Sequence, residues 1–209
     1  MIKVKICGIC HEVEIGIMNE LGPDYVGFVF VPKSRHFIAP EYAALLRSKL
    51  RRGIQTVGVF ANESLKTVAM TVEVSGINMI QLHGNETGEY VAALREYVRC
   101  PIMKVYKVAK PIDAEKAMYS TADLVMLDGG NAGDGRLFDW SLIGPVHRKF
   151  FLSGGLTPEN IEDALNLTSQ PYALNVSSGV EANRTKDYRK VMKFISAARN
   201  FKGKKRVSM

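Results

Sequence analysis

Two cysteines near the start of the chain, Cys7 and Cys10, have the C-x-x-C spacing of disulfide oxidoreductases and of zinc sites. A thioredoxin-type pair places its first cysteine at the N-terminus of a helix, whereas Cys7 follows the extended run 2–6. A structural zinc site needs two more ligands, and the sequence offers none nearby. We therefore expect one working thiol, Cys7, beside a cysteine at the N-cap of the first helix. An oxidative Cys7–Cys10 disulfide stays an alternative.

Asp128, which precedes two glycines, is a second residue suited to proton transfer. A thiolate accepts a proton from a carbon acid, and a carboxyl group donates one where burial or a nearby negative charge favours its neutral form. Cys7 and Asp128 together therefore suit acid–base chemistry. Each also has a plainer interpretation, an inert buried thiol for Cys7 and a turn residue for Asp128.

Eight short runs rich in β-branched and aromatic residues each predict a strand that would position these groups. They cover residues 2–6, 25–30, 55–60, 77–82, 102–106, 124–127, 149–152 and 172–176. Their starts are 22 to 30 residues apart, which leaves room for one helix and two loops per unit. Such alternation requires parallel strands with right-handed crossovers, and eight units favour closure. The sequence predicts a single-domain α/β protein, a (β/α)8 TIM barrel over 1–201, with a basic tail over 202–209.

Several residues between the strands signal helix boundaries. Gly22, followed by proline, ends the first helical pattern, and Cys10 stands at its expected start. Pro40 and Pro158 suit the first turn of a helix, where a missing N–H costs nothing. Asp139 precedes Trp140 and is expected to cap another helix.

Function in such a barrel belongs to the carboxyl ends of the strands, and the candidate residues gather there. Cys7 and Asp128 follow the first and sixth strands, Arg35 and His36 the second, and His83 the fourth. Small residues after the seventh and eighth strands let backbone N–H groups approach an anion, which in this fold is the usual phosphate cradle. The residues expected to bind phosphate are Gly154, Gly155, Ser178 and Gly179. We therefore expect a phosphorylated small-molecule substrate.

The overall composition narrows the possible partners. The net charge of +7 admits an anionic partner, but no aromatic residues interleave with the basic clusters at 47–52 and 199–206, so we expect no nucleic acid. No apolar run approaches the ~18 residues of a membrane span. Three cysteines and the lack of a signal-peptide pattern predict a cytoplasmic protein. We expect no metal and no cofactor, and a monomer or a homodimer.

Seven motifs, in the same order along the chain, resemble those of the phosphoribosylanthranilate isomerase family of tryptophan biosynthesis. They read KICGIC, VGFVF, IQLHGNE, LDGG, FDW, SGGLTPENI and NVSSGVE. The resemblance implies a small (β/α)8 barrel that rearranges N-(5'-phosphoribosyl)anthranilate to 1-(2-carboxyphenylamino)-1-deoxyribulose 5-phosphate. This Amadori rearrangement needs no metal and no organic cofactor.

The resemblance also implies roles for individual residues. Asp128 would be the general acid that protonates the furanose ring oxygen and opens the ring to a Schiff base. Cys7 would be the general base that removes the C2′ proton. Backbone groups of the four residues named above would hold the phosphate, and the expected substrate contacts are Arg35, His36, His83 and Asn175.

Three positions depart from the pattern of this family. His36 stands where the family usually has arginine, Asn175 where it has aspartate, and Asp134 where it has threonine or serine. These departures keep open a catalytically silent phosphosugar-binding protein. A third candidate is a related barrel isomerase of a histidine-pathway bisphosphate, although such enzymes resemble each other in using aspartate on the first strand, where this chain has Cys7.

Overall fold

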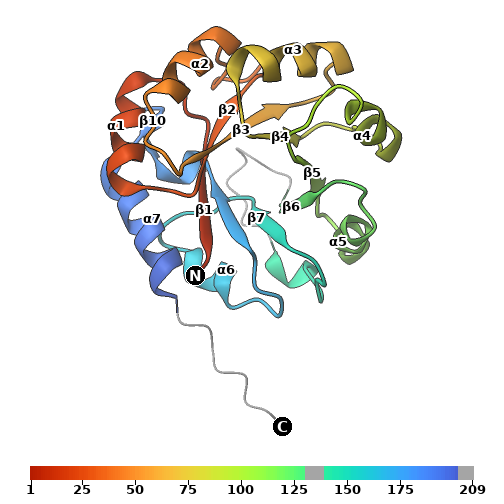
Figure 1. Ribbon diagram of the computed structural model, residues 1–209. Helices are drawn as coiled ribbons and strands as arrows, with labels where there is room; N and C mark the ends of the chain where they lie inside the picture. Colours follow the sequence, from red (N-terminus) through yellow and green to blue (C-terminus); the bar gives the residue numbers. More distant parts are fainter. Residues whose placement is uncertain (130–138, 202–209) are drawn as a thin grey trace.

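The computed structural model describes residues 1–129 and 139–201. Eight parallel strands form a closed barrel in the order in which they follow one another along the chain, and helices surround it (Figure 1). The predicted (β/α)8 TIM barrel is confirmed. Asp134 and the predicted tail 202–209 lie outside the described residues.

Each predicted run contains one strand, with bounds that differ from the prediction by no more than two residues. β1 pairs with both β2 and β8, which closes the barrel. The strands are β1 (Lys3–Cys7), β2 (Tyr25–Val29), β3 (Gln55–Phe60), β4 (Met79–Leu82), β5 (Ile102–Lys107), β6 (Leu124–Asp128), β7 (Phe150–Ser153) and β8 (Ala173–Val176). A two-stranded antiparallel hairpin of β9 (Glu181–Ala182) and β10 (Thr185–Lys186) follows.

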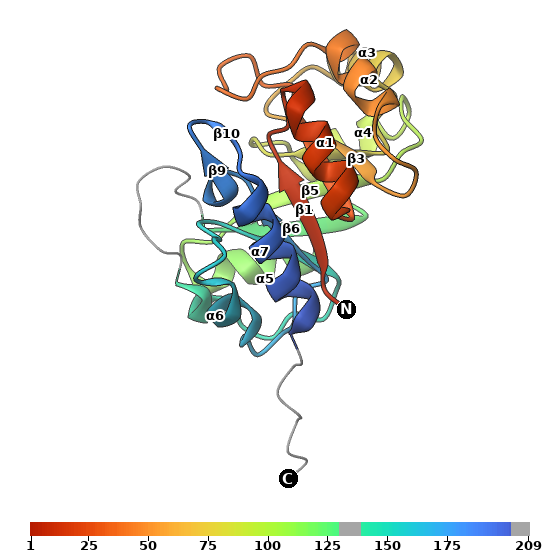
Figure 2. The ribbon, with the colours of Figure 1, turned by 90° about the vertical axis from the view of Figure 1, so that its left-hand side faces the viewer.

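The helices connect these strands on the outside of the barrel (Figure 2). They are α1 (Glu12–Leu21), α2 (Pro40–Ser48), α3 (Leu65–Ser75), α4 (Gly88–Leu94), α5 (Pro111–Met118), α6 (Ile161–Leu165) and α7 (Tyr188–Asn200), with short 3-10 helices η1 (Trp140–Leu142) and η2 (Ser178–Val180). Gly22 ends α1 in the left-handed region with φ 59°, and Pro40 begins α2, both as predicted.

Two predicted helix starts need correction, and a third is confirmed for a short 3-10 helix. The N-cap of α1 is His11, and Cys10 lies one residue before it, because Glu14 Oε2 accepts the backbone N–H groups of both (2.8 and 3.0 Å). Pro158 lies in a turn before α6. Asp139 does cap a helix by accepting from the backbone of Ser141, but among the described residues this is only the single 3-10 turn η1.

The alternation of side chains along β1 separates the core from the site. Val4 and Ile6 point outward and belong to the large apolar cluster between the strands and the helices. Lys3, Lys5 and Cys7 alternate with them and face the inside of the barrel. A second apolar cluster fills part of the interior, with Tyr25, Val57, Met79, Met103, Val105, Met126, Phe151 and Ala173. The barrel is therefore a packed core with a polar end. No described helix is long and apolar enough to cross a membrane.

Candidate active site

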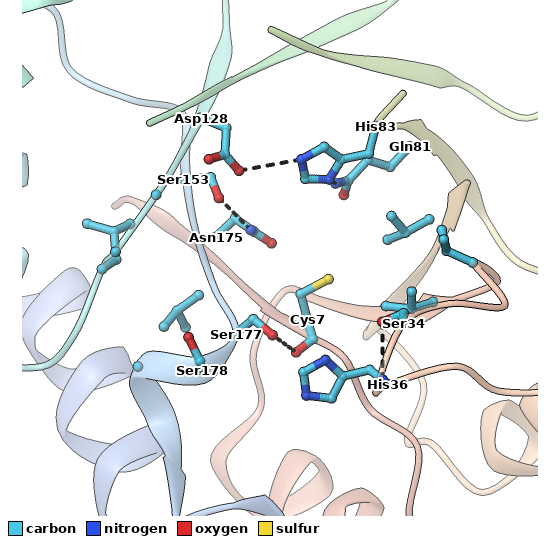
Figure 3. A pocket seen from close by; sticks show the side chains of 18 of the residues that line it. Cys7, Ser34, His36, Gln81, His83, Asp128, Ser153, Asn175, Ser177 and Ser178 are labelled. Carbon is cyan, nitrogen blue, oxygen red and sulfur yellow. Dashed lines mark hydrogen bonds and ion pairs between the residues drawn. The ribbon is translucent and has the colours of Figure 1, made fainter. Parts of the chain in front are cut away.

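A cavity of about 660 Å³ opens at the carboxyl ends of the strands, where the sequence placed the functional face (Figure 3). Residues from every strand end except that of β5 line it. Nine of the ten predicted site residues are among them: Cys7, His36, His83, Asp128, Gly154, Gly155, Asn175, Ser178 and Gly179. Arg35 is the exception, and its side chain is 50% exposed.

Cys7 and Asp128 end β1 and β6 and point into the same cavity (Figure 3). Cys7 is buried and forms a small apolar cluster with Val29 of β2 and Val59 of β3. The hydroxyl of Ser177 donates to the backbone oxygen of Cys7 at 3.0 Å, which ties the end of β1 to the loop after β8. The thiol and the carboxyl group thus face one ligand-sized space from different strands.

His83 lies between Asp128 and a buried glutamine, Gln81. Its Nε2 is 3.7 Å from Asp128 Oδ2, and its Nδ1 is 3.2 Å from the amide nitrogen of Gln81. Burial lowers the pKa of His83, although the charge of Asp128 acts in the opposite direction, so the imidazole is neutral at pH 7. Gln81 was not predicted as a site residue. The available signal was its spacing of two residues from His83, which places both side chains on the same face of an extended segment.

Glycines let the loop after β7 pack closely against the loops after β6 and β8. Gly154 and Gly155 have φ values of 101° and 66°, a region that favours glycine. A Cβ on Gly154 would lie 2.5 Å from the backbone nitrogen of Gly129, and one on Gly179 would lie 1.9 Å from the backbone oxygen of Leu156. Small residues here leave backbone N–H groups accessible to an anion in the cavity.

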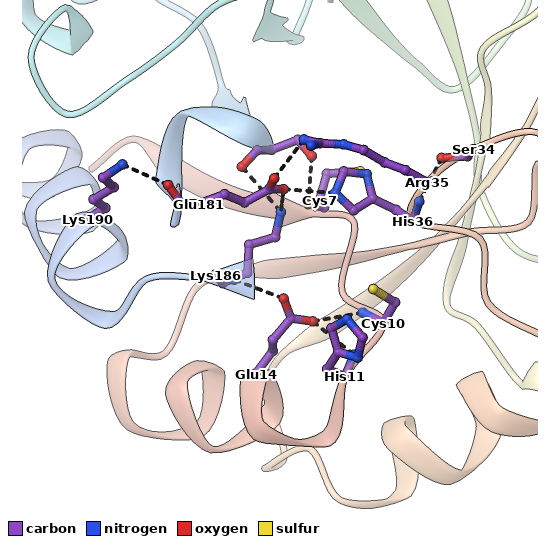
Figure 4. A network of polar contacts seen from close by, with 11 residues as sticks. Cys7, Cys10, His11, Glu14, Ser34, Arg35, His36, Glu181, Lys186 and Lys190 are labelled. Atoms are coloured by element: carbon purple, nitrogen blue, oxygen red, sulfur yellow. Dashed lines mark hydrogen bonds and ion pairs between the residues drawn. The ribbon is translucent and has the colours of Figure 1, made fainter. Parts of the chain in front are cut away.

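The carboxylate of Glu181 contacts three basic side chains (Figure 4). Arg35 and His36 come from the segment after β2, and Lys186 comes from β10. Glu181 Oε2 accepts from Arg35 at 2.7 Å, and its Oε1 lies 2.9 Å from His36 Nε2 and 2.6 Å from Lys186 Nζ. Burial alone would raise the pKa of Glu181, but the hydrogen bond and charge of Lys186 hold it below the usual value. The Glu181 carboxylate therefore holds both side chains from the segment after β2. His36 lines the cavity, whereas Arg35 does not.

Burial, together with the charge of Lys186, lowers the pKa of His36. At neutral pH the ring therefore carries one proton. Its Nε2 faces the acceptor Glu181, so the N–H lies on that side and Nδ1 is left as an acceptor.

Asn175 is held by two neighbours at the base of the cavity. Its Oδ1 accepts from Lys5 Nζ at 2.8 Å, and its Nδ2 donates to Ser153 Oγ at 3.0 Å. Lys5 is a residue that sequence analysis did not assign to the site. Among residues 1–129 and 139–201, no group of three or more His, Cys, Asp or Glu side chains is arranged to hold a metal ion.

Proteins of known sequence and structure are similar to nearly the whole chain. A family model described as N-(5'phosphoribosyl)anthranilate (PRA) isomerase matches residues 4–197. An N-(5'-phosphoribosyl)anthranilate isomerase from Clostridium kluyveri is 39% identical over 204 residues, which cover 97% of this chain and 100% of the relative.

Solved structures are similar as well. The phosphoribosyl anthranilate isomerase of Thermotoga maritima has a TM-score of 0.87 at 37% identity, with 96% of this chain and 100% of that chain covered. A phosphoribosyl anthranilate isomerase in complex with reduced 1-(o-carboxyphenylamino)-1-deoxyribulose 5-phosphate has a TM-score of 0.85 at 37% identity and the same coverage.

Proposed function

Since the chain belongs to the N-(5'-phosphoribosyl)anthranilate isomerase family of tryptophan biosynthesis, we propose that it performs the Amadori rearrangement of this substrate with Cys7 as general base and Asp128 as general acid. The observation that carries the proposal is that both groups face one cavity beside the two glycine-rich loops. The bound product analogue in a similar structure supports the same class of ligand.

The reaction divides between the two residues. Asp128 donates its proton to the furanose ring oxygen, the C1′–O bond breaks, and the anilino nitrogen supplies the electron pair that forms the Schiff base. The Cys7 thiolate then removes the C2′ proton, and the electrons of that bond move toward the nitrogen to give an enolamine. Tautomerisation, with a proton added at C1′, yields the ketone. Groups on separate strands suit this sequence because the two proton transfers occur at different atoms.

The phosphate of the substrate would lie against the loops after β7 and β8, and Gly179 offers a test. Gly179→Ala places a Cβ 1.9 Å from the backbone oxygen of Leu156, so the loops must separate. We expect inorganic phosphate, measured as a competitive inhibitor, to bind at least about tenfold more weakly, a loss of about 1.4 kcal/mol.

Gly144→Ala is the matched control, because a Cβ there meets nothing within 4 Å. It should keep the native phosphate affinity. Native affinity in Gly179→Ala, in a protein that melts as the native one does, would refute the proposed phosphate site.

His36 would face the anthranilate carboxylate, but in its neutral form it donates only toward Glu181. We therefore expect His36→Arg to lower KM about tenfold at pH 7.5, because a charge-assisted hydrogen bond contributes about 1.5–3 kcal/mol. The lowered pKa of His36 predicts the pH dependence of this gain. Because the pKa of His36 is lowered, the native ring becomes charged only at a more acidic pH than an ordinary imidazole, so native KM should fall as the pH is lowered and the two proteins should converge. Equal KM values across about pH 5.5–8.5 would contradict a carboxylate contact at this position.

The function itself is tested by adding the purified protein to freshly prepared N-(5'-phosphoribosyl)anthranilate and following fluorescence. We expect an enzyme-dependent loss of signal that is proportional to protein concentration. The alternative of a silent phosphosugar-binding protein draws on His36 and Asn175, the two described departures from the family pattern. Calorimetric binding of the reduced product analogue without turnover would favour that alternative and would refute the isomerase.

A further inference from the structure

Three lysines are buried among the described residues, and they differ in what compensates their charge. Burying an ammonium group costs free energy unless a counter-charge or hydrogen bonds offset it. Lys104 Nζ lies 3.0 Å from Glu86 Oε2, and Lys186 Nζ lies 2.6 Å from Glu181 Oε1. Lys5 is 0% exposed, and no carboxylate of the described residues lies within ion-pair distance of it. Its position therefore calls for a different explanation.

The described partner of Lys5 is an amide. Asn175 Oδ1 accepts from Lys5 Nζ at 2.8 Å, and the other end of the same amide donates to Ser153 Oγ at 3.0 Å. This second bond fixes the amide with its oxygen toward the ammonium. An amide orients and solvates a cation through its dipole, but it does not cancel the charge. Among the described residues, the ammonium group of Lys5 thus has an oriented amide beside it in place of a carboxylate.

Cys7 is the nearest reactive group to this charge. Lys5 and Cys7 are two residues apart on β1 and share its inner face. Gly27 of β2 pairs with Cys7, and a Cβ on Gly27 would lie 2.7 Å from Cys7 Sγ and 3.0 Å from Lys5 Nζ. Cys7 Sγ and Lys5 Nζ are therefore within about 6 Å of each other, both beside the position that a Gly27 side chain would take. At this distance an opposite charge strongly favours the ionised form of a group.

The other ionisable groups that face the cavity do not replace this effect. His36 and His83 line it with Cys7, and burial lowers the pKa of both, so they are neutral at pH 7. The charge of Lys5 itself contributes to the lowered pKa of His83, since an ammonium opposes a second positive charge nearby. Asp128 is a carboxyl group and brings no positive charge to the cavity. Lys104 and Lys107 also act on His83, but Lys104 is paired with Glu86, and Lys5 shares the inner face of β1 with Cys7.

We propose that Lys5 is a positioning residue that acts through Cys7: its ammonium group, oriented by Asn175, lies beside the sulfur and stabilises the negative charge that Cys7 carries when it acts as the base. The inference rests on the proposed role of Cys7. It also gives Asn175 a function, because an aspartate at that position would neutralise the ammonium.

The test measures the ionisation of Cys7 directly, without turnover. In a Cys10→Thr, Cys100→Ser background, the rate of alkylation of Cys7 by the neutral reagent iodoacetamide is followed against pH. Lys5→Met removes the charge with a side chain of similar length. We expect the midpoint of the alkylation profile to rise by about 1–3 pH units, the effect of an opposite charge within a few ångströms.

Lys3→Met is the matched control, because Lys3 lies on the same face of β1 but next to the rings of Tyr25 and Tyr172, two residues farther from Cys7. Its midpoint should stay within a few tenths of a pH unit of the native value. An equal shift in both variants, or no shift in Lys5→Met, would overturn the proposal.

Asn175→Asp provides a second test that keeps Lys5 in place, and it carries the test if Lys5→Met does not fold. The new carboxylate lies against the ammonium, so the midpoint should again rise, and an unchanged midpoint would refute the proposal. Alkylation and turnover together also distinguish the proposed role of Cys7 as the base from the proposed role of Lys5. A normal rate in Cys7→Ala would refute the base assignment whatever Lys5 does, whereas an inactive Cys7→Ala with an unshifted Lys5→Met would refute only the role of Lys5.

Discussion

Cys7→Ala should lower kcat about 10²–10⁴-fold, because the proposed base for the C2′ proton is lost and the cavity offers no thiolate in its place. KM should change little, since the substitution removes one small buried side chain at the end of β1 and leaves the loops after β7 and β8 intact. Steady-state kinetics with freshly prepared substrate measure both parameters.

Cys10→Ala is the matched control for this prediction. It makes the same substitution three residues later, where the side chain packs against the outer apolar cluster and does not line the cavity. Burial and the charge of Glu14 raise the pKa of the Cys10 thiol, which makes it a poor nucleophile and a poor base at neutral pH. Cys10→Ala should keep the native rate. A rate within twofold of native in Cys7→Ala would contradict the proposed base.

Asp128→Asn should lower kcat by a similar factor of about 10²–10⁴, because an amide has the size and hydrogen-bonding capacity of the acid but no acidic proton for the ring oxygen. The ring-opening step then becomes rate-limiting. A burst experiment should accordingly show no early build-up of product. The folded structure should persist, because Asn at the end of β6 fills the same volume.

Asp123→Asn tests the specificity of this effect on the same strand segment. Asp123 precedes β6 at the opposite end of the barrel, where it accepts from the backbone of Ile102 and pairs with Arg95. Its substitution should cost some thermal stability and leave kcat unchanged. If Asp128→Asn retained full activity, or if both variants lost activity equally, the acid assignment would be refuted.

The barrel and its functional face were predictable because the signals are local. Each strand is a short apolar run between turn residues, and a parallel barrel places all strand ends together, so Cys7, Asp128 and the two glycine loops had to share one mouth. The regular repeat of strand and helix along the chain was enough to predict this shared end of the barrel.

The remaining features depend on contacts between distant segments. In the sequence, Lys5 reads as an ordinary polar residue in an alternating strand, but in a closed barrel its face is the interior, beside Asn175 of β8. Glu181 fixes His36 only because the hairpin after β8 lies next to the segment after β2. No spacing rule links residues that are about 145 or 170 positions apart. Local patterns therefore predict which loops meet and leave open which side chains pair.

A crystal structure of this protein with the reduced product analogue tests the central claim most directly. We predict that the phosphate lies against the backbone of Gly154, Gly155, Ser178 and Gly179. The carbon chain should lie between Cys7 Sγ and the Asp128 carboxyl group, with each group within hydrogen-bond reach of the atom that it serves. We also predict that His36, not Arg35, lies beside the anthranilate ring. An analogue bound elsewhere, or bound with Cys7 or Asp128 facing away from the reacting carbons, would contradict the proposed mechanism.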